Sequence, residues 1–219
     1  MGRPRRLGRR ADTRPLASCS VKLGGDFWRP ANPRLGGVLR LTWRCMPLSA
    51  DAIREAFAAL SDELQQKGTP AELIIVGGAA LVLMFQARDS TKDVDAYFVR
   101  PEGSVVRSAA EAVAERLNLP EDWLNDGAKG YLVGVTSGDV LYESKSLTVR
   151  AASIAQLLAM KLAAWRDAID RADARLLLTH MSGTADEVWS AIEPFLSPHH
   201  HDKASYAFED LWETSRGNS

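Results

Sequence analysis

Hydrophobic and polar positions predict alternating helices and strands downstream of residue 46. A helical pattern covers Ala50–Gln66, and Ser49 stands where an N-cap is expected. The apolar run Leu73–Val76 is too short for a helix and stops at two glycines, which predicts a buried strand. After helix-compatible residues Ala79–Gln86 and a polar turn, the segment DVDAYFV alternates with period two and predicts a second strand.

The second half of the chain is predicted to become helical. Ser104 is expected to cap a helix that runs to about residue 117, and two strands are expected near 140–143 and 147–149. From Ser153, a candidate N-cap, every pattern is helical. We therefore predict an α/β fold in which a mixed sheet with flanking helices is followed by a helical C-terminal half, with a site between the two.

Two aspartates on the second strand are candidate metal ligands. Asp93 and Asp95 lie two residues apart, so both side chains leave the same face of the strand. Mg²⁺ prefers hard oxygen ligands and is usually held by one or two carboxylates together with substrate phosphates. Backbone N–H groups freed by Gly77 and Gly78 at the start of a helix would meet a triphosphate.

Either motif alone is common without any function, because a glycine pair after a strand is often only a tight turn. Their combination resembles the first motif of the nucleotidyltransferase-fold toxins of the AbiE and MenT type, from bacterial toxin-antitoxin systems. In that family a GS or GG pair precedes a D-x-D pair, and the serine is replaced here by a second glycine. The positions that carry the resemblance are Gly77, Gly78, Arg88, Thr91, Asp93 and Asp95.

A second segment, Leu157–Leu178, resembles the lysine-helix motif of the same family. Its matching residues are Lys161, Arg166, Asp170 and Asp173. Lys161 stands in the apolar run LLAMKLAAW, where an unpaired ammonium would be costly to bury, so a carboxylate or phosphate is expected nearby. The alternative is that the lysine extends to the surface and that Asp170 and Arg171 are ordinary solvated charges.

The resemblance implies roles for these residues. Asp93, Asp95, Lys161 and Asp173 would be catalytic, with Asp93 and Asp95 binding the metal. The nucleotide-binding positions would be Gly77, Gly78, Arg88, Thr91, Arg166 and Asp170. The tract Leu119–Asp126, LPEDWLND, also resembles a stretch from an uncharacterised branch of these proteins. Within it Trp123 is the aromatic residue expected to border a pocket, whereas Glu143 is not expected to be a third carboxylate ligand.

Charge is distributed unevenly along the chain. Residues 1–45 hold 11 Lys and Arg against 2 Asp and Glu, a balance of +9, whereas the rest holds 16 against 26, a balance of −10. We expect a basic, disordered extension over 1–45, an α/β nucleotidyltransferase core over 46–150 and a helical region over 151–219. The extension is either an arm that touches RNA phosphates or an upstream addition to the reading frame. Both cysteines lie within it, which fits a reducing cytoplasm, and no apolar stretch is long enough to span a membrane.

The implied function is Mg²⁺-dependent transfer of a nucleoside monophosphate from an NTP to an acceptor hydroxyl. By resemblance the acceptor is the 3′ end of a tRNA, and the protein is a toxin restrained by a partner antitoxin. The net charge of −10 outside the extension argues against a broadly basic RNA-binding surface. Two alternatives therefore stay open, a transferase acting on a small molecule or protein hydroxyl and a nucleotide-binding module without turnover.

Overall fold

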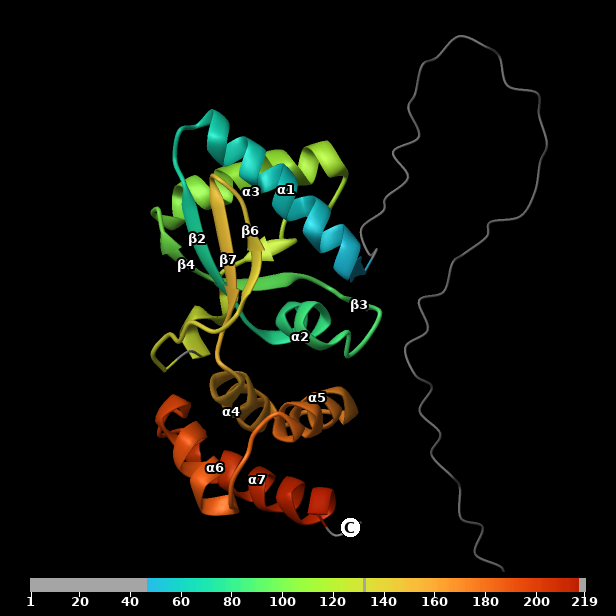
Figure 1. Ribbon diagram of the computed structural model, residues 1–219, viewed down its shortest axis with the longest axis vertical. Coiled ribbons are helices and arrows are strands. Elements are labelled where there is room, and N and C mark those ends of the chain that lie inside the picture. Colours follow the sequence, from blue (N-terminus) through green and yellow to red (C-terminus); the bar gives the residue numbers. More distant parts are fainter. Residues whose placement is uncertain (1–46, 132, 217–219) are drawn as a thin grey trace, which may run out of the picture. The chain divides into compact units, whose positions relative to one another are not determined.

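The central element of the fold is a five-stranded mixed sheet (Figure 1). The protein is represented by a computed structural model, which describes residues 47–131 and 133–216. The strands lie in the order β5-β4-β2-β7-β6, and their bounds are β2 Ala71–Ile75, β4 Val94–Arg100, β5 Leu124–Asn125, β6 Val140–Glu143 and β7 Leu147–Ala151.

Strand directions in this sheet are mixed. Strand β2 runs antiparallel to β4 and parallel to β7, while β5 is parallel to β4 and β6 is antiparallel to β7. A separate pair joins β1 (Leu48–Ser49) to β3 (Ser90–Thr91) in antiparallel fashion. Part of the predicted polar turn before Asp93 is therefore a short strand. Two residues are too few to show the alternation that predicts a strand.

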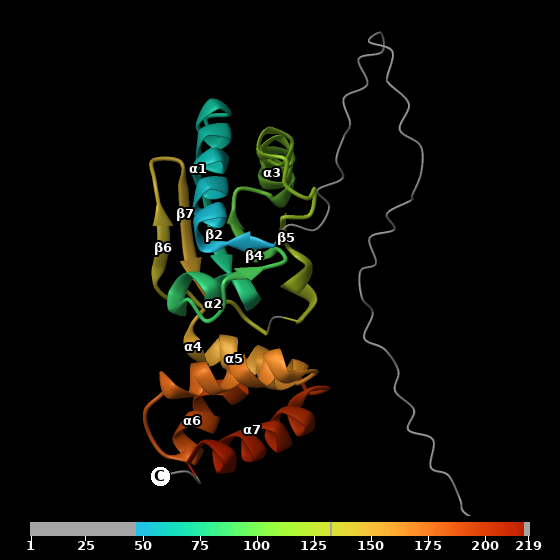
Figure 2. The same ribbon diagram turned by 90° about the vertical axis from the view of Figure 1, so that its right-hand side faces the viewer.

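Helices cover the sheet and fill the C-terminal half. Helices α1 (Ala50–Gln66) and α3 (Gly103–Leu117) lie side by side against the sheet (Figures 1 and 2). Both views place α2 (Gly77–Phe85) between the sheet and the C-terminal helices. The C-terminal helices are α4 Ile154–Ala164, α5 Ala168–Thr179, α6 Ala185–Ile192 and α7 His201–Arg216, and the short 3-10 helices are η1 Gly127–Tyr131 and η2 Glu193–Phe195. The predicted fold class is confirmed.

Capping side chains fix two of the predicted helix starts. Ser49 accepts a hydrogen bond from the N–H of Ala52, and Ser153 accepts one from Gln156, as expected for N-caps. The prediction for Ser104 was wrong, because α3 already begins at Gly103 and its N-cap residue, Glu102, makes no side-chain capping bond.

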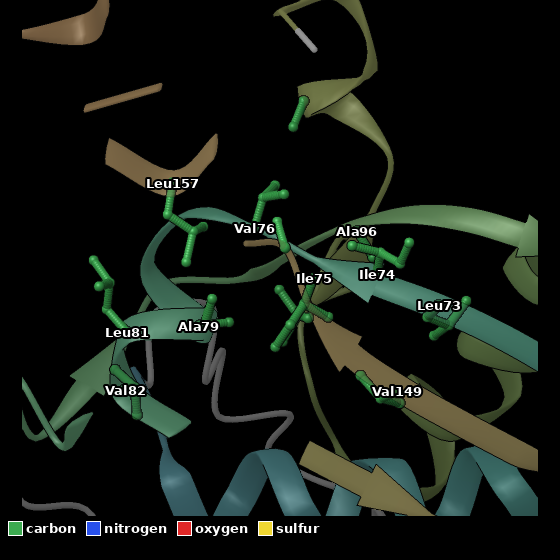
Figure 3. Packing of buried hydrophobic residues seen from close by; sticks show 14 of the residues in the cluster. Leu73, Ile74, Ile75, Val76, Ala79, Leu81, Val82, Ala96, Val149 and Leu157 are labelled. Carbon is green, nitrogen blue, oxygen red and sulfur yellow. The ribbon is translucent and has the colours of Figure 1, made fainter. Parts of the chain in front are cut away.

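The hydrophobic core joins the sheet to α2 and α4. Val94, Ala96 and Phe98 alternate as buried residues along β4, which leaves Asp95 on the opposite, half-buried face. In Figure 3, Leu157 of α4 lies near Val76 and Leu81. The helical half therefore packs directly on the turn that leads from β2 into α2.

In the two described ranges, every helix is too short or too polar to cross a membrane. The expectations for residues 1–45, including both cysteines, fall outside the described residues. The predicted boundary at residue 151 stays a prediction, although β7 ends at Ala151 and α4 begins three residues later.

Candidate functional site

The Asp95 carboxylate lies beside the first turn of α2, and Asp93 is close enough to act on it by charge. Asp93 directly precedes β4, and Asp95 is its second residue. The backbone carbonyl of Asp95 accepts a hydrogen bond from Val76 at 2.9 Å, which ties β4 to the end of β2. A Cβ atom on Gly77 would stand 3.3 Å from Asp95 Oδ2, so the carboxylate is directed at the α2 backbone.

The surroundings of the Asp95 carboxylate disfavour its ionised form. Burial and the negative charge of Asp93 raise the pKa of Asp95, while a hydrogen bond from Asn125 and the charges of Lys161 and Lys92 lower it without cancelling the rise. Within the part of the chain that the structure describes, neither Asp93 nor Asp95 forms an ion pair with a lysine or arginine. A bound cation would therefore stabilise both carboxylates.

The glycine pair begins α2 rather than preceding it. Val76 is the N-cap and contributes no side-chain capping bond, and Gly77 has a φ of 62°, which favours glycine. A Cβ on Gly78 would stand 2.6 Å from Thr91 Oγ1 and 2.8 Å from an Arg88 guanidinium nitrogen. The hydroxyl and the guanidinium therefore cover the first turn, where uncapped N–H groups and the helix dipole favour an anion.

Lys161 is held by two carboxylates of α5. Its Nζ lies 3.1 Å from Asp170 Oδ1 and 2.8 Å from Asp173 Oδ2, and its side chain is 12% exposed. The alternative of a lysine that extends into solvent is therefore wrong for this structure. Asp173 Oδ2 also accepts a hydrogen bond from Arg88 at 3.2 Å, which connects α5 to the loop after α2.

Asp170 anchors the start of α5. Its Oδ2 accepts hydrogen bonds from the backbone N and the Nε of Arg166, at 3.2 and 3.1 Å. Burial alone would raise the pKa of Asp170, but the bonds from Lys161 and Arg166 bring it below its ordinary value. Asp170 is 3% exposed, so in this structure it holds the two cations, and its direct contact with a nucleotide stays a prediction.

The structure brings the predicted residues into two adjoining groups. One lies around the start of α2 and β4, and the other on α4 and α5. They are joined by the bond between Arg88 and Asp173 and by the charge of Lys161, which acts on Asp95. Glu143 lies on edge strand β6, opposite Thr148 and separated from β4 by two strands, so it is not part of either group.

The tract Leu119–Asp126 was only partly understood from the sequence. Trp123 is fully buried and donates from Nε1 to the carbonyl of Ala110, so its predicted place at a pocket border was wrong. Asn125, two residues later, is the register partner of Asp95 on the neighbouring strand. In the sequence, only the resemblance of the tract Leu119–Asp126 to related proteins could have pointed to Asn125.

The donor set fits Mg²⁺ better than a transition metal. Among the described residues, no group of three or more His, Cys, Asp or Glu side chains is placed to hold an ion. Two carboxylates with the rest of the shell left to water and phosphate are the usual protein contribution to a Mg²⁺ site. Asp93 and Asp95 can supply that contribution, and Asp95 lies beside a helix start suited to phosphates.

Residues 52–177, more than half of the chain, match the family described as "Nucleotidyltransferase of unknown function (DUF6036)". The chain belongs to this nucleotidyltransferase family. The matched span runs from α1 into α5 and contains both groups of site residues. No curated protein and no solved structure matches the chain. Membership supports a nucleotidyltransferase, without specifying the toxin type named above.

Proposed function

We propose that the protein is a Mg²⁺-dependent nucleotidyltransferase that transfers a nucleoside monophosphate from an NTP to an acceptor hydroxyl. One observation carries the proposal. Of two carboxylates that repel each other, Asp93 and Asp95, the second stands next to the start of α2, where no side chain caps the helix. Asp95 is directed at Gly77, and Thr91 and Arg88 cover Gly78. Membership of a nucleotidyltransferase family supports the same chemistry.

Each group in the site has a task in that reaction. Asp93 and Asp95 would hold Mg²⁺, which when bound neutralises charge on the triphosphate and polarises the α-phosphate. The backbone N–H groups of Gly77 and Gly78, with the Thr91 hydroxyl, would receive phosphate oxygens. Arg88 and Lys161 would add positive charge beside them, as preorganised groups that stabilise the developing negative charge.

The covalent step exchanges one phosphorus–oxygen bond at the α-phosphate for another. The acceptor oxygen forms a bond to the α-phosphorus while the bond from that phosphorus to the bridging oxygen breaks. Pyrophosphate leaves, and the proton of the acceptor hydroxyl passes to solvent. Asp170 and Asp173 are buried and hold Lys161, Arg166 and Arg88 in place. In the proposed reaction Asp173 orients Lys161 or helps to position the acceptor hydroxyl.

The proposed acceptor is the 3′ end of a tRNA, which would make the protein a growth-arresting toxin with a cognate antitoxin. This part of the proposal rests on the motif resemblance alone. A tRNA ends in a ribose hydroxyl that is free to attack a phosphorus, so the chemistry is the same as for other acceptors. A small-molecule or protein hydroxyl and a module without turnover are outcomes that the following experiment distinguishes.

The test is incubation of the purified full chain with Mg²⁺, each α-labelled NTP in turn, and total tRNA. A variant carrying Asp93→Ala and Asp95→Ala serves as the inactive control. Asp89→Ala is the matched control, because it removes an exposed carboxylate in the same loop region. We expect label in RNA with the unchanged chain and with Asp89→Ala only.

Two other results would change the proposal. Label on the protein itself, or on a small hydroxyl compound added to the mixture, would replace tRNA as the acceptor. Triphosphate binding without release of pyrophosphate in any mixture would contradict turnover. Growth arrest on expression that survives the double alanine substitution would contradict nucleotidyl transfer as the cause of toxicity.

A further inference from the structure

The tract Leu119–Asp126 runs beside the carboxylate strand and is anchored to α3 at one end by Trp123. The indole Nε1 donates to the carbonyl of Ala110 at 3.0 Å, and the ring is fully buried. The Trp123 carbonyl accepts a hydrogen bond from Val94 at 2.7 Å. These two bonds fix where the tract begins to pair with β4.

Asp126 anchors the other end of the tract. Its carboxylate lies 2.8 Å from Arg107 of α3 and 3.5 Å from Lys129 of η1. Only Leu124 and Asn125 lie between the two anchors, and Leu124 is buried. Residues on both sides of β5 are thus bonded to α3, which fixes the register of β5 against β4.

This register places Asn125 beside Asp95. The two residues are Cα partners on parallel strands, so their side chains leave the same face about 4.8 Å apart. Beside this register, Asn125 acts on the Asp95 carboxyl and lowers its pKa, as a hydrogen-bond donor next to an ionised carboxylate does. Since an ionised carboxylate can only accept, the amide nitrogen is the donor.

The other atoms of the amide are accounted for. Asn125 Oδ1 accepts a hydrogen bond from the backbone N–H of Gly127 at 2.9 Å, and Nδ2 donates one to the Asp122 carbonyl, with nitrogen and oxygen 3.5 Å apart. The second Nδ2 hydrogen is left for Asp95. A Cβ on Gly127 would stand 2.9 Å from Asn125 Oδ1, so any side chain at position 127 would push the amide away.

We propose that Asn125 is a positioning residue, whose amide holds the Asp95 carboxylate in the orientation in which it binds Mg²⁺ together with Asp93. The inference rests on the proposed function and assigns a task to the tract Leu119–Asp126. A neutral amide suits this place because a third carboxylate would add repulsion to a pair that already repel each other. Partners that orient metal ligands in this way commonly affect metal affinity strongly.

Mn²⁺ binding to the full chain, followed by the electron paramagnetic resonance signal of the free ion, tests the inference without relying on activity. We expect Asn125→Ala to weaken Mn²⁺ binding about 10-fold. Gly127→Ala is expected to do the same, because it displaces the amide while Asn125 itself stays. Asn118→Gly, at an exposed left-handed C-cap, is the matched control and should bind as the unchanged chain does.

Asn125→Asp separates positioning from a local structural role. An aspartate still accepts the Gly127 N–H, so a role confined to that turn predicts unchanged Mn²⁺ affinity. A role beside Asp95 predicts a changed affinity, since the donor is lost and a negative charge is gained. Melting temperatures of all variants, measured without metal, show whether a loss of binding reflects a loss of fold.

Failure of the inference is distinct from failure of the proposed function. Unchanged Mn²⁺ affinity in Asn125→Ala and Gly127→Ala, with a defect in Asp95→Asn, would overturn the role of Asn125 and leave the carboxylate site standing. Equal binding by the unchanged chain and Asp95→Asn would contradict the metal site itself. A melting temperature lowered in step with affinity would assign Asn125 to stability only.

Discussion

Replacing Asp173 with alanine is expected to destabilise the protein by about 2 to 3 kcal/mol. The Asp173 carboxylate is shared by Lys161 at 2.8 Å and Arg88 at 3.2 Å, and its side chain is only 6% exposed. The substitution leaves both cations without this partner. The buried Nε of Arg88 already lacks a hydrogen-bond partner, so the loss falls on a guanidinium that is incompletely satisfied.

The magnitude follows from burial and from the partners that remain. Removing one member of a buried ion pair costs about 3 to 5 kcal/mol. Lys161 keeps Asp170 at 3.1 Å, and 27% of the Arg88 side chain reaches solvent, so the lower figure above is expected. For a domain of this size, that loss corresponds to a fall in melting temperature of about 5 to 10 °C.

Urea unfolding at neutral pH without divalent cations, followed by far-ultraviolet circular dichroism, measures this free energy. Glu209→Ala removes the same charge from an exposed position on α7 and should stay within about 0.5 kcal/mol of the unchanged chain. If Asp173→Ala unfolds with the same free energy as that control, the carboxylate does not support the network.

A double-mutant cycle isolates the link between the two groups of the site. We expect a coupling free energy of about 1 to 2 kcal/mol between Arg88→Met and Asp173→Ala. Strict additivity of the two substitutions would refute the bond from Arg88 to Asp173 as a connection between the α/β part and α5.

Three further outcomes follow from the site. Asp95→Asn should raise the melting temperature without metal and abolish its rise with Mg²⁺. The pKa of Asp95 is raised in the folded protein, so the protonated form adds to the free energy of unfolding, and this contribution is lost as pH rises through that pKa. At neutral pH the buried charge therefore destabilises the fold, and asparagine removes that charge. Gly78→Ala should cost about 1 to 3 kcal/mol in urea unfolding, because its Cβ would meet a hydroxyl oxygen at 2.6 Å. Lys161→Met should shift acid unfolding to higher pH. The lowered pKa of Asp170 gives stability that is present above its unfolded pKa and lost as pH falls through the folded one, and the lysine is a main cause of that lowering.

Local signals explain which parts of the fold were predictable. Ser49 and Ser153 cap helices through bonds to residues three positions away, and β4 alternates with period two, so each is written in neighbouring residues. The bond from Arg88 to Asp173 joins positions 85 residues apart. Sequence spacing carries no information on such a contact. It depends on the pairing of β7 with β2, which brings α4 and α5 close to the loop after α2.

The candidate site shows the same division. The spacing of Asp93 and Asp95 predicted a shared face, and the apolar surroundings of Lys161 predicted a carboxylate partner. The place of Asn125 could not be derived, since it depends on the parallel register of a two-residue strand. A strand that short has no alternation to recognise, and its position is fixed by Trp123 and Asp126 from outside.

The order in which the site residues leave the ribosome has a consequence for activity. A nascent chain that has emerged through Ala151 contains the carboxylate pair and the strands that position it, but not Lys161, Asp170 or Asp173. Chains are made and fold from the N-terminus, so the lysine and its two aspartates join the site only when α5 has been synthesised. Under the proposed function, a translation product that stops before α5 would be inert, and the reaction would be withheld until α5 has been made.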